Sequence, residues 1–152
     1  MLPSRTLLCA ALMLLTTPAL AELHLSSAWI RALPPTQPVT AAYAEVMNHS
    51  DTAATISGAR VDGAGRVEIH TTLEQDGLMR MQRLDELVVP PGETVSLAPG
   101  GAHLMLFDLQ AMPKEGESRQ LCLLLASGEE SCVAAEVRKD AAASGHEHHQ
   151  HH

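Results

Sequence analysis

The central part of this chain alternates between apolar and polar residues in short runs that are separated by turn-forming residues. A period of two is typical of β-strands that bury one face, and no segment here shows the 3.6-residue period of a long amphipathic helix. The pattern predicts an all-β domain, either a β-sandwich or a β-barrel. The expected strands cover residues 29–32, 41–47, 55–61, 66–73, 78–84, 86–89, 94–97, 102–109, 121–125 and 130–137.

The first 21 residues have the pattern of a secretory signal. Arg5 supplies a positive charge, residues 7–15 are almost continuously apolar, and Pro18 precedes an Ala-Leu-Ala tripeptide that ends at Ala21. We expect cleavage after Ala21, with a retained N-terminal anchor as the alternative. The apolar run is too short for a permanent transmembrane helix. Cys9 lies too early, and after too poor a motif, for lipid attachment.

Composition narrows the class of protein further. Without Arg5, the remaining 131 residues carry 9 basic and 18 acidic side chains, a net charge of −9. This acidity disfavours nucleic-acid binding. No second long apolar stretch follows, so we expect no membrane insertion after cleavage. The length suits one domain over residues 22–138 and a tail over residues 139–152.

Two cysteines remain after cleavage, Cys122 and Cys132. An even pair in an exported protein predicts a disulfide. If residues 126–128 form a three-residue hairpin loop with Gly128 in a left-handed conformation, Cys122 lies directly opposite Cys132 and the bond is within reach. A thiolate metal or redox site is the alternative, although a spacing of ten residues does not match the usual C-x-x-C motif.

Candidate metal ligands occur in two tripeptides, Met79-Arg80-Met81 and His103-Leu104-Met105. Residues at positions i and i+2 of a strand share a face, so His103 and Met105 project together. Met79 shares a face with Met81 and is a possible auxiliary ligand. We assign Met47 and Met112 to packing, and we expect His24 and His49 to be exposed to solvent.

His70 joins these candidates through a predicted hairpin across residues 74–77. If all four residues form the loop, His70 lies directly opposite Met81; if only Asp76 and Gly77 form it, Met81 faces Thr72 and His70 is a diagonal neighbour. Both registers place His70 and Met81 on one face. A further fold that brings residues 102–109 beside the hairpin would complete a site of two His and two Met.

Two imidazoles and two thioethers favour Cu(I), because thioether sulfur is soft and neutral and contributes little to binding Zn, Mg or Ca. A blue-copper electron-transfer site normally needs a Cys thiolate, which a disulfide would remove. No carboxylate pair, nucleophile–base set or phosphate-binding loop suggests an enzyme. The donor set therefore favours carrying copper over electron transfer or catalysis.

The spacing from His70 to Met81 to His103-x-Met105 resembles the signature of the periplasmic PCuAC family of copper chaperones. The matching flanks are Val67-Glu68-Ile69-His70, residues 76–81, Pro90-Pro91-Gly92, residues 99–106, residues 28–31, Pro34-Pro35, Ala41-Ala42-Tyr43 and Asn48. The resemblance covers about residues 23–137. One departure is Thr71, where many relatives have Met; on a strand this position points away from His70.

The resemblance implies a cupredoxin-like Greek-key β-barrel that binds Cu(I) through the two His and two Met. It also implies a periplasmic protein that delivers copper to the CuA centre in subunit II of cytochrome c oxidase, alongside a Sco-type protein. We expect a monomer. The alternative function is copper sequestration for tolerance or storage, and a copper enzyme is the third possibility.

The tail differs in composition from the domain. Residues 140–145 are mostly small, and five imidazoles follow within seven residues: His146, His148, His149, His151 and His152. Such a segment cannot bury enough apolar surface to fold alone, so we expect it to be disordered. With no Met it should prefer Cu(II) or Zn, and we hypothesise that it captures Cu(II). A functionless end and an engineered tag are the alternatives, although Glu147 and Gln150 interrupt the run.

Overall fold

The computed structural model describes residues 23–140, which contain ten β-strands and no helix. The predicted all-β class is therefore confirmed. The strands are β1 (Leu23–Arg31), β2 (Thr40–Asn48), β3 (Ala54–Val61), β4 (Ala64–Gln75), β5 (Leu78–Leu84), β6 (Leu87–Val89), β7 (Thr94–Leu97), β8 (His103–Leu109), β9 (Ser118–Leu125) and β10 (Glu130–Arg138). Within residues 23–140, no helix is long and apolar enough to span a membrane. The predictions for the signal sequence and for the five tail histidines lie outside the described residues.

Strand β1 begins six residues earlier than the expected 29–32. Leu23 and Leu25 are buried and His24 is exposed, as alternation requires, but the register with β2 shifts between Ser26 and Trp29. Ser27 has a positive φ of 52° at this irregularity. Such a β-bulge inserts an extra residue and breaks the period of two, which is the signal that strand prediction uses.

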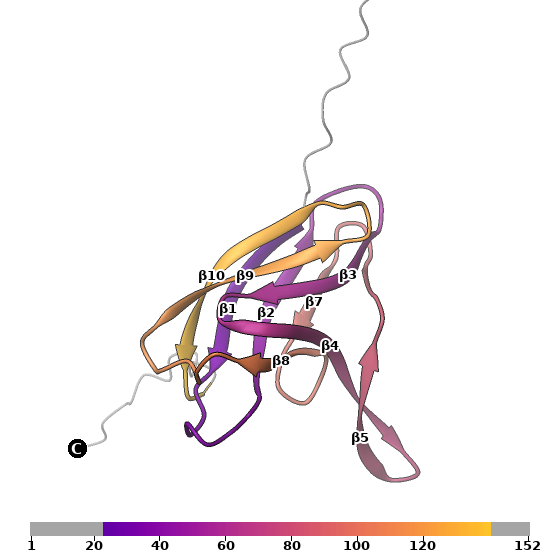
Figure 1. The fold of residues 1–152 in the computed structure, drawn as a ribbon. Coiled ribbons are helices and arrows are strands. Elements are labelled where there is room, and N and C mark those ends of the chain that lie inside the picture. The colour runs from indigo at the N-terminus through magenta and orange to yellow at the C-terminus, as the bar shows by residue number, and fades with distance from the viewer. Residues whose placement is uncertain (1–22, 141–152) are drawn as a thin grey trace, which may run out of the picture.

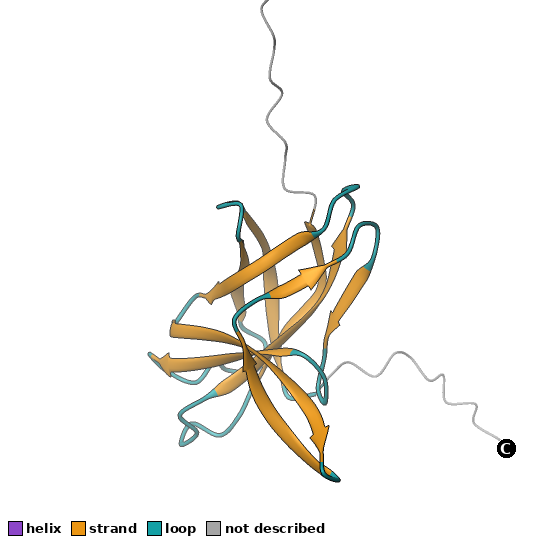
Figure 2. Ribbon diagram, turned by 90° about the vertical axis from the view of Figure 1, so that its right-hand side faces the viewer, coloured by secondary structure: helices purple, strands orange, loops and turns teal. Residues whose placement is uncertain are grey.

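The strands form one sheet in the order β5-β4-β8-β2-β1-β10-β9-β3-β6, with β7 also paired to β2. The sheet curls around its own apolar face (Figures 1 and 2). One edge of β2 pairs with β1, and the other edge is divided between β8 at residues 40–42 and β7 at residues 44–47. β1 and β10 pair in parallel, which joins the two ends of the domain sequence.

The two faces of the sheet carry different side chains. The inner face supplies a core of aliphatic residues, among them Leu104, Leu106, Leu121 and Leu123, all fully buried. The outer face of β1, β2 and β8 carries a smaller buried cluster of Trp29, Ala41 and Tyr43, against which Met105 packs. The strand β8 therefore buries aliphatic side chains inward and presents His103, Met105 and Phe107 outward, as alternation dictates.

The β4–β5 hairpin extends beyond the rest of the sheet (Figure 1). β8 pairs with β4 only as far as His70, whereas β5 pairs with β4 from Ile69 to Gln75. Gln75 pairs with Leu78, so the loop has two residues, Asp76 and Gly77, both with positive φ. This Asp-Gly loop is the sequence preference of tight hairpin turns. Beyond His70, the outer half of the hairpin is a two-stranded ribbon.

The β9–β10 hairpin has the predicted register. Cys122 is directly opposite Cys132, and the two are joined by a disulfide. Leu125 and Glu129 close a three-residue loop in which Gly128 has a φ of +90°. The disulfide prediction is confirmed. Cys122, Glu130 and Cys132 converge closely enough to hold a metal, but sulfurs joined in a disulfide offer no thiolate for the alternative metal site.

Candidate metal centre

Two histidines lie side by side where β4 and β8 meet. His70 and His103 are directly opposite residues of the antiparallel pair, and their ring centroids are 6.1 Å apart. His103 is buried, and the side chain of His70 is 15% exposed. The period of two aims both rings at the outer face of the sheet. Two residues 33 positions apart in sequence thus become neighbours with little access for water.

In each ring, one nitrogen is hydrogen-bonded to an oxygen. His103 Nδ1 donates to the carbonyl oxygen of Gly101 at 2.9 Å, so its proton resides on Nδ1 and Nε2 keeps a lone pair. His70 Nε2 donates to the carboxylate of Glu68 at 2.9 Å. His70 Nδ1 is buried and has no hydrogen-bond partner among the described residues. The pair therefore offers two free lone pairs on different ring nitrogens, Nδ1 of His70 and Nε2 of His103.

Glu68 is a site residue that sequence reasoning did not select. Its side chain is only 13% exposed, and it lies opposite Met105 on β8 and two residues before His70 on the same face. The hydrogen bond from His70 lowers the pKa of Glu68 most, with Arg66 and Arg83 adding to the effect and partial burial opposing it. Because its pKa is lowered, the Glu68 carboxylate stays ionised at pH values where an ordinary glutamate takes up a proton. The signal for Glu68 in the sequence was its place two residues before His70, which puts both side chains on one face of a strand.

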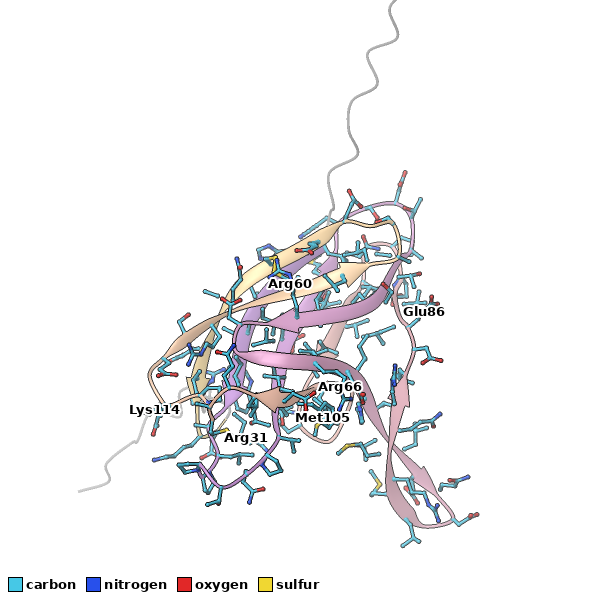
Figure 3. The ribbon with its side chains drawn as sticks, viewed as in Figure 1. Arg31, Arg60, Arg66, Glu86, Met105 and Lys114 are labelled. Carbon is cyan, nitrogen blue, oxygen red and sulfur yellow. A yellow bond between two sulfur atoms is a disulfide. The ribbon has the colours of Figure 1, made fainter. Side chains whose placement is uncertain are left out.

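The methionines occupy the predicted face but differ in exposure. Met105 is half-buried against the aromatic cluster and, as Figure 3 shows, lies near the base of the β4–β5 hairpin. Met81 pairs with Thr72, which selects the second of the two predicted registers and makes His70 its diagonal neighbour. Met81 is 58% exposed, and Met79 is 65% exposed further out on the ribbon. Thr71 lies on the opposite face, because residues alternate along β4.

An aromatic ring lies beside each histidine of the pair. Tyr43 lies 6.4 Å from His103 and Phe107 lies 6.3 Å from His70, measured between ring centroids. Trp29 packs on Tyr43 at 4.4 Å. Burial raises the pKa of Tyr43, so the phenol stays neutral and is a poor metal ligand near pH 7.

The arrangement supplies neutral nitrogen donors and soft sulfur donors in a partly dry setting. Such donors suit copper better than hard cations such as Mg or Ca. Within residues 23–140, no nucleophile hydrogen-bonded to a base lies beside the histidines. The chemistry that this geometry supports is binding and release of a soft metal ion.

Comparisons with known proteins agree with the fold. A family model described as "Putative lipoprotein LpqE-like" matches residues 23–137. "Putative lipoprotein Lxx21020" of Leifsonia xyli subsp. xyli is 33% identical over 116 residues, which is 76% of this chain and 69% of that protein.

Two solved structures are similar over most of the chain. The solution structure of CuI-DR1885 from Deinococcus radiodurans is 30% identical, covers 83% of this chain and 82% of its own, and has a TM-score of 0.62. The copper-bound PCuAC domain from PmoF2 is 24% identical, covers 80% of this chain and 97% of its own, and has a TM-score of 0.66. The similarity to the PmoF2 domain shows the fold alone.

The fold class is therefore the cupredoxin-like fold of PCuAC domains, as expected from the sequence. The chain belongs to the LpqE-like, PCuAC-type copper chaperone family.

Proposed function

We propose that this chain binds Cu(I) through His70, Met81, His103 and Met105 and carries it to an acceptor protein. The proposal rests on the His70–His103 pair. In each ring, one nitrogen is hydrogen-bonded to an oxygen, and the other nitrogen has a lone pair free for a metal. The donor type adds support, because imidazole and thioether suit Cu(I). The similarity to CuI-DR1885 from Deinococcus radiodurans, at 30% identity, supports the same cargo.

Exposure supports transfer rather than permanent storage. His103 is buried, whereas Met81 is 58% exposed on a hairpin that extends from the sheet. An incoming ligand from another protein can reach the metal from the Met81 side without moving the core. The negative charge of Glu68, bonded to His70, offsets part of the charge of the bound ion without adding a hard ligand to it.

We propose the CuA site in subunit II of cytochrome c oxidase as the acceptor, with a Sco-type protein as a further partner. The protein acts in the periplasm as a monomer after cleavage behind Ala21. The resemblance of the His70 to Met105 motif to PCuAC chaperones supports this assignment. The lipoprotein names of the family model and of the relative in Leifsonia xyli are consistent with export.

Deleting the gene distinguishes delivery from sequestration. For delivery, we expect reduced cytochrome c oxidase activity in low-copper medium, rescued by the wild-type gene but not by a Met81→Leu/Met105→Leu variant. A Met112→Leu variant is the matched control, because it loses a thioether outside the site. Sensitivity to high copper with normal oxidase activity would instead establish sequestration and contradict delivery.

The proposal extends to the tail, where His146, His148, His149, His151 and His152 capture Cu(II) near the domain. The density of imidazoles in a short polar segment supports this role. A chain that ends at Lys139 should bind fewer equivalents of Cu(II) in a titration followed by its visible absorption. Unchanged Cu(II) stoichiometry would rule out capture by the tail.

A further inference from the structure

Three more metal donors converge at the other end of β1 and β2. His24 on β1 is directly opposite Met47 on β2, and His49 follows Met47 by two residues. The ring centroids of His24 and His49 are 6.1 Å apart, the same separation as in the His70–His103 pair. All three side chains are exposed, and neither imidazole forms a hydrogen bond to another described residue.

The exposure of Met47 contradicts its assignment to packing. Met47 is 36% exposed, whereas its neighbour Val46 is fully buried in the core. Alternation along β2 therefore places Met47 on the outer face. A long apolar side chain at such an exposed position gains little from packing. The expected exposure of His24 and His49 is confirmed.

This cluster lies on the same face of β2 as the proposed copper site. Ala41 pairs with Met105 and Tyr43 packs near His103, and both share the face of Met47 because the period is two. Six residues separate Ala41 from Met47, which is about 20 Å along a strand. Without a bulge, His24 and Trp29 would point to opposite faces of β1. The extra residue at the Ser27 bulge lets both side chains face outward.

We infer that His24, Met47 and His49 form a second site for a soft monovalent cation, Cu(I) in the function proposed above. Two imidazoles and one thioether suit three-coordinate Cu(I), and the same donors bind Ag(I). No donor carries charge, and Glu45, two residues before Met47 on the same face, provides mild attraction for a cation. The site is weaker than the first, because its rings lack oxygen partners that fix their orientation.

The site is tested by titrating the full chain with Ag(I) and following each methionine methyl and histidine ring by NMR. The tail contains no Met, so a shift of the Met47 methyl cannot come from metal bound there. We expect the Met47 methyl and the rings of His24 and His49 to shift together, after the methyls of Met81 and Met105. The Met112 methyl should stay unchanged as the internal control.

Two variants make the assignment specific. His49→Asn and His24→Asn should each raise the Ag(I) concentration that half-saturates the Met47 shift by at least about tenfold. Both residues are exposed, so each variant should keep the amide spectrum of the folded protein. The second site is overturned if the Met47 methyl does not move at saturating Ag(I), or if it half-saturates in both variants at the same Ag(I) concentration as in the wild type.

The same titration keeps the two proposals separate. Shifts of Met81 and Met105 without Met47 support only the site at His70 and His103. A shift of Met47 alone supports the second site and contradicts the first.

Discussion

Glu68 decides which nitrogen of His70 keeps a free lone pair in the proposed copper site. Its carboxylate accepts a hydrogen bond from Nε2, and this leaves the buried Nδ1 without a proton and available to copper. Outer partners of metal-ligating histidines orient the ring and set its tautomer. His103 achieves the same result with a different nitrogen, because the Gly101 carbonyl holds its Nδ1. Both histidines are therefore oriented by an oxygen partner in the proposed site.

Replacing Glu68 by Ala should free the His70 ring and weaken Cu(I) binding by about 10- to 100-fold. Glu68→Gln should lose less, because its amide oxygen still accepts the bond from Nε2. Competition with a Cu(I) chelator measures the affinity, and ¹⁵N NMR of the apo imidazoles measures the tautomer of His70. Equal affinity in wild type and Glu68→Ala would refute the positioning role.

Strand periodicity predicted the shared face of His70 and Met81, and the structure bears out that placement. The same rule places Glu68 on that face, but its carboxylate is a hard donor and was not among the soft donors that predicted the site. Met47 was assigned to packing, but its exposure depends on which face of the sheet the odd-numbered residues of β2 occupy, and the folded structure decides that. Ring nitrogen assignments depend on partners such as Gly101 that only the folded structure supplies.

At the scale of elements, the β4–β5 hairpin determines how the site opens. Ile69 and Leu84 anchor its base, whereas Leu73 and Leu78 near its tip are about half exposed. An isolated two-stranded ribbon is marginally stable, so its stability comes from the half of β4 that pairs with β8. Met81 is therefore presented on the part of the site that is least covered by other elements.

The β9–β10 hairpin carries a disulfide, far from the proposed copper site. Arg60, which pairs with Cys122, lies well away from Met105 in Figure 3. Along the sheet, β2 and β1 separate β8 from β10. The disulfide thus supports the fold without touching the metal donors.

A Cys122→Ala/Cys132→Ala variant should lose about 3 kcal/mol of unfolding free energy, the chain-entropy value for a cross-link across about ten residues. Urea unfolding measures this loss. Cu(I) affinity of the folded variant should equal that of wild type. A large loss of affinity in the folded variant would show that the two hairpins are coupled.

At the scale of the molecule, the strands could be predicted but their order could not. Nine of the ten strands start within three residues of their predicted positions, because alternation and turn residues are local signals. The pairing of β4 with β8 joins residues 33 apart, and β1 with β10 joins the two ends of the domain; neither has a local signal. Only the motif resemblance indicated that residues 102–109 fold beside the hairpin.

The central claim is that two histidine nitrogens and two methionine sulfurs bind Cu(I) at the junction of β4, β5 and β8. X-ray absorption of the Cu(I)-loaded protein tests it most directly, compared with a Met81→Leu/Met105→Leu variant and a Met112→Leu control. We predict sulfur scattering in the wild type and control. In the double variant it is lost once Met47→Leu also removes the thioether of the second site, and nitrogen scattering is retained in every sample. Absence of sulfur scattering in the wild type would contradict the site.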